Sequence, residues 1–189
     1  MSTTERTIVH GITGEEITFV ESCHETNQEY LFIRVKLPPE GEGPPLHYHL
    51  AFEETFEVEK GELMVTVREE EIKLTPGDRV TVPVGVNHRF TNTSNEPVTF
   101  TVRLTPGHQF EESMRIGYGL IEDRKVNEKG LPKNMIHTAL ILKMQDTYIC
   151  EIPKAVQYLL FNNLANLGRW FGVEKSLKNK YLPDYLQGK

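Results

Sequence analysis

The sequence predicts a mainly β protein, an all-β sandwich or barrel with a C-terminal α-helical appendage. Its first hundred residues contain short runs of β-branched and aromatic residues, separated by turn signals of Pro, Gly and Asn. Many short strands at such spacing favour a sandwich or barrel. From about Gly107 the apolar residues recur at helical spacing instead, which is typical of amphipathic helices. The length of 189 residues and the 38% hydrophobic content are enough for one core.

The first predicted strands lie in the segments EITFVES and EYLFIRVKL. In the second segment Leu31, Ile33, Val35 and Leu37 occupy alternate positions, so that one face of this strand should turn inward. The following PPEGEGPP, residues 38–45, is predicted to be a loop, because its prolines lack an N–H donor and its glycines loosen the backbone.

The segment ETFEVEKGELMVTVREEEIKL predicts a hairpin that turns at Lys60-Gly61, followed by a short strand. Further turn signals at Pro76-Gly77, Pro83 to Gly85 and Asn92 to Pro97 predict the ends of later strands. Glycine tolerates a positive φ, so Gly61, Gly77 and Gly85 are expected to permit these turns.

Three helical segments are predicted after Gly107. HQFEESMRIGYGLIEDRK has apolar residues at helical intervals, although two glycines weaken that pattern, and PKNMIHTALILKMQ should begin its helix at Pro132. The third segment, PKAVQYLLFNNLANLGRWFG, can end at Gly172. Its apolar stripe consists of Ala155, Val156, Leu159, Leu160, Leu164, Leu167 and Phe171. We interpret this stripe as a core face that packs against the barrel or a second subunit.

These patterns divide the chain into a β-barrel at residues 1–106 and a helical C-terminal extension at residues 107–189. The extension is expected to pack on the barrel or at a dimer interface. Its apolar surface exceeds what so small a barrel needs, which predicts a homodimer.

Composition argues against several classes of partner. The formal net charge of −6 and the pI near 5.7 make nucleic acid and anionic lipid unexpected partners. The N-terminal MSTTERTIVHG lacks the pattern of a secretion signal, and the run YLLF is too short for a membrane span. We therefore predict a cytoplasmic protein. Cys23 and Cys150 are predicted to be reduced thiols.

Three histidines and one glutamate form the candidate site. His47 and His49 are two residues apart, so in a strand they project from one face and can chelate a metal ion. Glu54, Phe56 and Val58 occupy alternate positions of the next predicted strand. Glu54 therefore lies on the same inward face as these apolar residues. An unpaired carboxylate there is unfavourable, and a cation held jointly with the histidines would remedy this.

His88 also alternates with an apolar partner, Phe90, and should face the same interior. His47, His49, Glu54 and His88 are therefore predicted to form a metal site. Glu53 is out of this register and should be solvated. The remaining histidines, His10, His24, His108 and His137, have no spacing partners and are expected to be ordinary surface or core residues. Arg34, Arg79 and Arg103 should point outward.

Two motifs carry a resemblance to a known family. Gly41, His47, His49, Glu54 and Gly61 fit the pattern G(X)5HXH(X)3-4E(X)6G, and a second pattern, G(X)5PXG(X)2H(X)3N, follows. This second pattern is met by Gly77, Pro83, Gly85, His88 and Asn92. Both motifs are complete and occur in the expected order, so roughly residues 29–105 resemble the cupin superfamily. In particular, they resemble single-domain cupins of the cupin 2 conserved-barrel, quercetin dioxygenase-like type.

The resemblance implies a jelly-roll β-barrel with one divalent metal ion held by His47, His49, Glu54 and His88. Imidazole and carboxylate ligands suit Fe, Mn, Ni, Cu, Co or Zn, and the ligand set does not choose among them. Asn92 is expected to have a structural role. An apolar cavity lining is suggested for Phe56, Val58, Phe90, Val98, Phe100 and Val102.

Cupin barrels support many functions, so the resemblance leaves several hypotheses open. The first is a metal-dependent dioxygenase for an aromatic or enolic small molecule, in which Glu54 is a ligand and could act as a base when displaced. The second is a non-catalytic module that binds a metal ion and a small ligand, and the third is a metal-dependent isomerase. An open coordination position and an empty pocket would favour an enzyme over the module.

Overall fold

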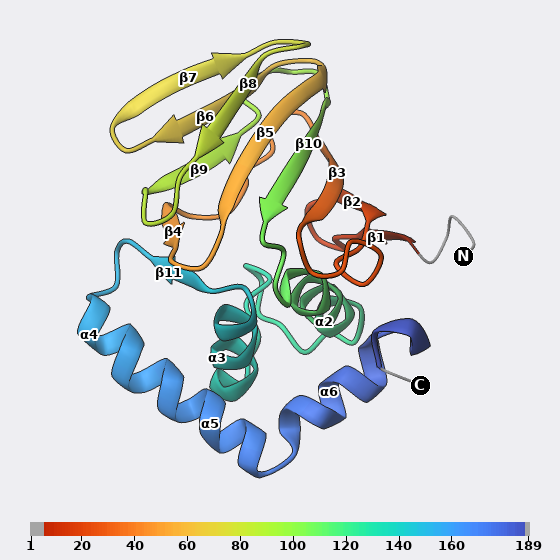
Figure 1. The fold of residues 1–189 in the computed structure, drawn as a ribbon, viewed down its shortest axis with the longest axis vertical. Coiled ribbons are helices and arrows are strands. Elements are labelled where there is room, and N and C mark those ends of the chain that lie inside the picture. Colours follow the sequence, from red (N-terminus) through yellow and green to blue (C-terminus); the bar gives the residue numbers. More distant parts are fainter. Residues whose placement is uncertain (1–5, 188–189) are drawn as a thin grey trace.

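Two antiparallel sheets face one another, and the helices gather at one end of them (Figure 1). The structure is a computed structural model that describes residues 6–187. The first sheet has the order β1-β2-β3-β10-β5-β8, and the second has the order β11-β4-β9-β6-β7. The strands are β1 (Thr7–Val9), β2 (Glu16–Glu21), β3 (Leu31–Leu37), β4 (His47–His49), β5 (Glu53–Lys60), β6 (Leu63–Val67), β7 (Glu70–Leu74), β8 (Arg79–Val82), β9 (His88–Thr91), β10 (Val98–Thr105) and β11 (Thr147–Ile149). This confirms the predicted jelly-roll β-barrel with a helical C-terminus.

The barrel core lies between the sheets and follows the predicted alternation. The four apolar residues at alternate positions of β3, Leu31 to Leu37, are buried, and so are the alternate apolar residues of β10 that begin at Val98. The rings of Phe56, Phe90 and Phe100 pack against one another with centroids 5.2–6.4 Å apart. The residues suggested as a cavity lining therefore pack in this core.

The predicted hairpin at Lys60-Gly61 is wrong, because β5 and β6 lie in different sheets. β5 pairs with β10 and β8, whereas β6 pairs with β9 and forms a hairpin with β7. Gly61 has a φ of +85°, and a Cβ there would lie 2.9 Å from the carbonyl oxygen of Pro97. The turn thus leads the chain from one sheet to the other and passes close to the backbone of Pro97. Only glycine permits this path without strain.

The helical region contains more elements than predicted. The helices are α2 (Phe110–Glu122), α3 (Met135–Met144), α4 (Lys154–Val156), the π-helical η1 (Gln157–Phe161), α5 (Asn162–Trp170), α6 (Val173–Tyr181) and the short η2 (Asp184–Leu186). α3 begins after Asn134, whose side chain caps the backbone N–H of Ile136 at 2.9 Å, and not at Pro132. Gly172 ends α5 in the left-handed conformation, as predicted. The sequence patterns did not reveal α6 and β11.

The apolar stripe predicted for the third helical segment does not pack against the barrel, and its packing against a second subunit stays a prediction. Val156, Leu159, Leu160, Leu167 and Phe171 are exposed. The opposite side of α5 is buried instead, and its small residues Ala165 and Gly168 let it approach α3 closely. Small residues permit close helix packing, so the bulky stripe is left facing solvent.

The extension is joined to the barrel by specific contacts. β11 pairs with β4. The Ser22 hydroxyl donates a hydrogen bond to Glu111 on α2 at 2.6 Å, and the Tyr118 hydroxyl donates one to Glu15 at 2.8 Å. The boundary between residues 106 and 107 stays a prediction.

Two further sequence expectations concern the membrane and the thiols. Among residues 6–187, no helix combines the length and the apolarity needed to cross a bilayer. Cys23 is buried, Cys150 is half-buried, and both are free thiols, as predicted.

Candidate metal centre

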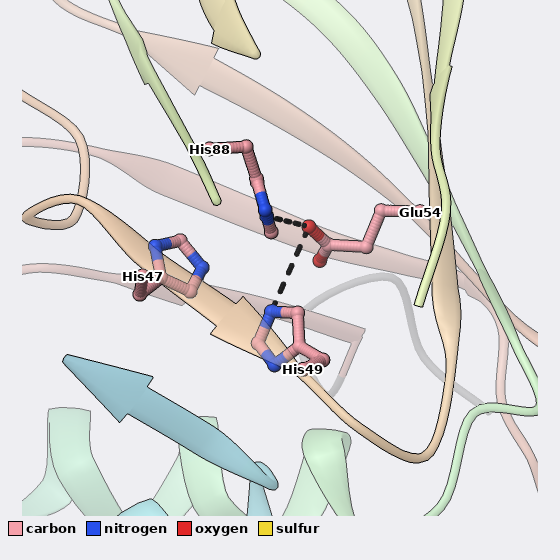
Figure 2. A group of neighbouring side chains, drawn as sticks. All are labelled: His47, His49, Glu54 and His88. Atoms are coloured by element: carbon pink, nitrogen blue, oxygen red, sulfur yellow. Dashed lines mark hydrogen bonds and ion pairs between the residues drawn. The ribbon is translucent and has the colours of Figure 1, made fainter. Parts of the chain in front are cut away.

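The four predicted site residues converge between the two sheets (Figure 2). His47 and His49 come from β4 and His88 comes from β9. His47 and His88 are direct partners across these strands. Glu54 lies on β5 of the other sheet, opposite Val82 on one side and Leu104 on the other. The site therefore bridges the two layers of the barrel.

The four side chains are close enough to share one ion. Each offers a ligand atom, and these atoms all lie within 4.8 Å of one another. The Nε2 atom of His88 lies 2.7 Å from the Oε2 atom of Glu54, and the Nε2 atom of His49 lies 3.8 Å from the same oxygen. The four residues are between 1% and 6% exposed. The sequence thus predicted a buried cluster that could hold a metal ion.

The side-chain parities expected from the sequence are confirmed. Tyr48 points away from its two histidine neighbours and stacks on Tyr148 of β11 at a centroid distance of 5.3 Å. Glu53 is exposed. Arg34 and Arg79 form exposed ion pairs with glutamates of neighbouring strands. None of these three exposed side chains enters the cluster.

Backbone carbonyl groups fix the orientation of all three imidazole rings. The Nδ1 atom of His47 lies 2.8 Å from the Pro45 carbonyl oxygen, and that of His88 lies 3.0 Å from the Val86 carbonyl oxygen. The Nδ1 atom of His49 lies 3.2 Å from the carbonyl oxygen of Asp146. A carbonyl oxygen only accepts, so each Nδ1 must carry the proton and each Nε2 turns to the centre.

The orphaned nitrogen at this centre fits a metal ion. Within the described residues, the buried Nε2 atom of His49 has no hydrogen-bond partner. Buried polar atoms without partners are rare and need an explanation. A neutral imidazole held by a second hydrogen bond at Nδ1 is the usual form of a metal-ligating histidine. Three such imidazoles and one carboxylate suit a divalent transition metal ion.

The electrostatics of the cluster keep most of its donors ready for a cation. Burial, together with the neighbouring His88 and His49, lowers the pKa of His47 to about 3, and burial lowers the pKa of His49. Burial also opposes ionisation of Glu54, but the His88 hydrogen bond and the surrounding histidines outweigh it and lower the pKa of Glu54 to about 2. At neutral pH the site therefore offers the neutral imidazoles of His47 and His49 beside a carboxylate.

His88 differs from the other two histidines. Burial disfavours its charged form, but the hydrogen bond to Glu54 outweighs burial, so the pKa of His88 is raised. Its Nε2–H donates to Glu54 in the metal-free site. A bound cation would take the place of this proton.

Two neighbours of the cluster were not found from the sequence. The ring of Phe52 stacks on His49 at a centroid distance of 4.1 Å, and Asp146 contributes its carbonyl from the helical extension. Asp146 carries no motif, and its role depends on the pairing of β11 with β4. The other four histidines lie outside the cluster of possible ligands found among residues 6–187, as predicted.

The part of the chain that carries this cluster matches a known protein family. Residues 33–104 match the family model described as "Cupin domain". The chain contains a cupin domain. This match includes all four residues of the cluster, and it stops before α2. Asn92 of the cupin domain is buried, and its side-chain amide donates to the carbonyl oxygens of Pro38 and Glu96, both at 2.8 Å. Its predicted structural role is confirmed.

One curated relative of this chain is the oxidoreductase iacF of Pestalotiopsis fici. It is 28% identical over 142 residues, which cover 68% of this chain and 69% of the relative. Because 68% of this chain is about 128 residues, more than the 106 residues that precede the helical extension, this similarity reaches into the extension.

Two solved structures are also similar to part of this chain. A cupin-superfamily sugar phosphate isomerase from Silicibacter pomeroyi is 26% identical, with a TM-score of 0.45 over 50% of this chain and 60% of that chain. A predicted oxalate decarboxylase from Thermotoga maritima is 23% identical, with a TM-score of 0.49 over 56% of this chain and 96% of that chain. These TM-scores are too low to indicate the reaction of this chain.

Proposed function

We propose that this cupin binds one divalent transition metal ion through His47, His49, Glu54 and His88, and that it is a metal-dependent oxidoreductase of the dioxygenase class. The observation that carries the proposal is the convergence of three Nε2 atoms, each fixed by a carbonyl at Nδ1, on one buried carboxylate. The similarity to a relative named as an oxidoreductase supports the class of reaction.

The residues of the site have distinct tasks in this reaction. The three histidines would hold the ion as neutral donors. When bound, a redox-active ion supplies Lewis acidity and one-electron chemistry toward dioxygen. Glu54 is the carboxylate of the four-residue cluster, and when displaced from the ion it is the group able to accept a proton from a substrate hydroxyl. Phe52 and the aromatic core beside the site exclude water from it.

The substrate class follows from the balance of a dioxygenase reaction. Both oxygen atoms of O2 enter the product, so the organic substrate supplies all the electrons and no external reductant is needed. An aromatic or enolic small molecule is electron-rich enough for this, and its acidic hydroxyl gives Glu54 a proton to accept. We therefore propose this class as the substrate.

One observation favours a second candidate function. The four cluster residues are at most 6% exposed, so a substrate reaches the site only if neighbouring side chains move. A metal ion in so closed a site could instead stabilise a non-catalytic binding module. This alternative needs a metal ion but no O2 chemistry.

Elemental analysis followed by oxygen consumption separates these candidates. The protein is purified without a nickel column and analysed by mass spectrometry beside His49→Ala, His88→Ala and the control His24→Ala, which changes an exposed histidine. We expect about one ion per chain in the wild type and the control, and loss in both site variants. Retained metal in both site variants would refute the site. Bound metal without oxygen consumption on aromatic or enolic compounds would favour the module.

A further inference from the structure

The short turn between α3 and β11 lies against His49, although it follows the cupin domain in the sequence. Asp146 occupies this turn with a φ of +48°. Its carbonyl oxygen accepts a hydrogen bond from the Nδ1 atom of His49 at 3.2 Å. β11, which starts at the next residue, pairs Thr147 with His49 and Ile149 with His47. Figure 2 shows this strand running beside the two histidines.

The carboxylate of Asp146 makes a second set of contacts. Its Oδ2 atom accepts hydrogen bonds from the backbone N–H groups of Leu50 at 2.6 Å and Ala51 at 2.7 Å. These residues form the turn that joins His49 on β4 to Glu54 on β5. One aspartate therefore fixes both the ring of one candidate ligand and the backbone link to the next ligand.

His49 is the histidine that depends on a distant segment. His47 and His88 donate to carbonyls two residues earlier in the chain, those of Pro45 and Val86, just before their strands begin. The carbonyl that orients His49 lies 97 residues away and outside the cupin match. Two of the three rings are therefore oriented within the cupin domain, and the third is oriented by the extension.

We infer that Asp146 is a positioning residue for the metal centre and that the C-terminal extension completes this centre through it. The inference rests on the metal site of the proposed function. Partners of metal-ligating residues fix the tautomer and the ring orientation, and their loss typically weakens metal binding about 10–100-fold. Asp146 has both roles, through its carbonyl and through its carboxylate.

Co2+ titration by calorimetry tests this inference. Asp146→Ala removes both bonds to the 50–51 turn, and we expect about 10-fold weaker Co2+ binding. Asp146→Asn keeps a side-chain oxygen acceptor and should recover most of the affinity. The control is Asp78→Ala, because the Asp78 carboxylate also accepts a backbone N–H bond, from Thr75 in a different and exposed turn. Unchanged Co2+ affinity in Asp146→Ala would overturn the inference.

A second readout separates this inference from the proposed metal function. Nitrogen-15 NMR of the metal-free protein reports the tautomer of each histidine. We expect His49 to be protonated at Nδ1 in the wild type and in Asp78→Ala. Asp146→Ala keeps the backbone carbonyl but loses the carboxylate bonds that hold it against the 50–51 turn, so His49 should become a tautomer mixture. A wild type that binds no Co2+ would refute the metal function, and an unchanged His49 tautomer in Asp146→Ala would then still refute the positioning role.

A different surface, the outer face of η1 and α5, is apolar although it faces solvent. This helix runs along the edge of the molecule, away from the barrel (Figure 1). Its exposed apolar side chains, which we call the η1–α5 face, are Tyr158, Leu159, Leu160, Leu167, Trp170 and Phe171. Trp170 is 81% exposed. Exposed apolar patches of this kind mark interaction surfaces.

Composition and area fit a protein partner on the η1–α5 face. Residues 155–168 contain no Asp, Glu, Lys or Arg, although a quarter of the chain is charged. Depletion of charge with enrichment of aromatic residues is typical of interface cores. An aromatic side chain covers roughly 150–250 Å2, so three aromatic residues and three leucines approach the ~800 Å2 per partner of a standard interface.

The spacing on this face suits a second copy of the same helix. Leu160, Asn163, Leu167 and Trp170 are separated by three, four and three residues and line one shallow groove of about 580 Å3. This is the a/d spacing of packed helix pairs, in which one polar Asn sets the register. A symmetric pair would place each apolar row in the groove of the other.

Nearby cations do not favour a lipid surface. Arg169 and Lys178 pair with Glu174, and Lys180 pairs with Asp123. The geometry points to a homodimer formed by two η1–α5 faces, with the Asn163 side chains near the symmetry axis. This proposal is independent of the metal centre.

Light scattering after size exclusion tests the dimer. We expect a mass twice the 21.7 kDa of one chain for the wild type, and a monomer for Leu167→Glu. Leu131→Glu is the control, because Leu131 is exposed elsewhere, and it should remain dimeric. A monomeric wild type, or a Leu167→Glu variant that stays dimeric, would overturn the proposal. Wild-type binding to phosphatidylcholine and phosphatidylserine vesicles that Leu167→Glu lacks would assign the face to membranes instead.

Discussion

At the scale of single residues, three backbone carbonyls decide the chemistry of the site. Each of them holds one imidazole by Nδ1, so that the other nitrogen is left for the centre. Burial then keeps His47 and His49 neutral at physiological pH. Glu54 supplies the negative charge that these neutral donors lack, so the affinity of the site for a cation should depend on this one carboxylate.

Substitution of Glu54 by Gln tests this dependence. A ligand at about 100 times its dissociation constant stabilises a protein by about 2.7 kcal/mol, or about 5–10 °C for a chain of this size. We expect Co2+ to raise the melting temperature of the wild type by this amount and to leave that of Glu54→Gln nearly unchanged. Glu53→Gln, the exposed neighbour, is the control and should respond like the wild type. An equal response of Glu54→Gln would show that the cation binds elsewhere.

The two cysteines should differ in reactivity. Cys23 is buried, and burial together with the nearby Glu112 and Glu111 raises the pKa of its thiol to about 12. Cys150 is half-buried. Because the thiolate is the reactive form, we expect Ellman's reagent to modify Cys150 in the native protein and Cys23 only after unfolding. Native Cys150→Ser should therefore be nearly unreactive, and rapid modification of this variant would contradict the burial of Cys23.

At the scale of helices, two glycines with different surroundings are informative. A Cβ on Gly168 of α5 would lie 2.6 Å from the Cγ2 atom of Ile136 on α3, whereas a Cβ on Gly117 of α2 would meet no atom within 4 Å. The first glycine permits helix packing. The second lowers helix stability without an evident packing role.

Alanine at these two glycines should have opposite effects. Gly117→Ala should stabilise the protein by about 0.5–1 kcal/mol, because alanine favours the helix. Gly168→Ala should destabilise it by about 1 kcal/mol or more, since overpacking outweighs the same gain. Urea denaturation measures both free energies of unfolding. A stabilised Gly168→Ala would mean that α3 and α5 do not pack as closely as described.

The sequence predicted the strands and the site residues better than it predicted how the strands are connected and paired. The alternation of Leu31 to Leu37 and the spacing of His47, His49, Glu54 and His88 are local patterns, so their burial and convergence followed from parity. Which strands pair is not a local property, and the predicted hairpin at Lys60-Gly61 failed for that reason. β11 has three residues, too few for a periodic signal, and thus Asp146 was missed.

In the helical extension the sequence pattern was misleading for a different reason. Its apolar stripe has the correct period, but period alone does not say which face is buried. The small residues Ala165 and Gly168 turned out to pack against α3, and the large residues face solvent. A homodimer, as proposed here, would give the larger side chains the burial that their pattern indicates.

At the scale of the whole molecule, the barrel and the helical extension share a sheet. β11 pairs with β4, Asp146 reaches the 50–51 turn, and Tyr118 of α2 packs in the barrel core. Gly107 lies two residues after the end of β10, and a Cβ there would lie 2.3 Å from the Sγ atom of Cys23. The boundary after residue 106 therefore separates two sequence patterns but crosses one packed structure.

A chain that ends at residue 106 should lose more than its helices. It lacks the strand that covers β4, so His47 and His49 would lie on an exposed sheet edge, which is prone to pair with other chains. We expect residues 1–106 to unfold without a cooperative transition, to aggregate, and to bind Co2+ weakly. Near-ultraviolet circular dichroism and calorimetry measure this against the full chain. If residues 1–106 instead kept the native spectrum and the Co2+ affinity of the full chain, His49 would need no partner from the extension, and the barrel would be complete as a separate cupin domain.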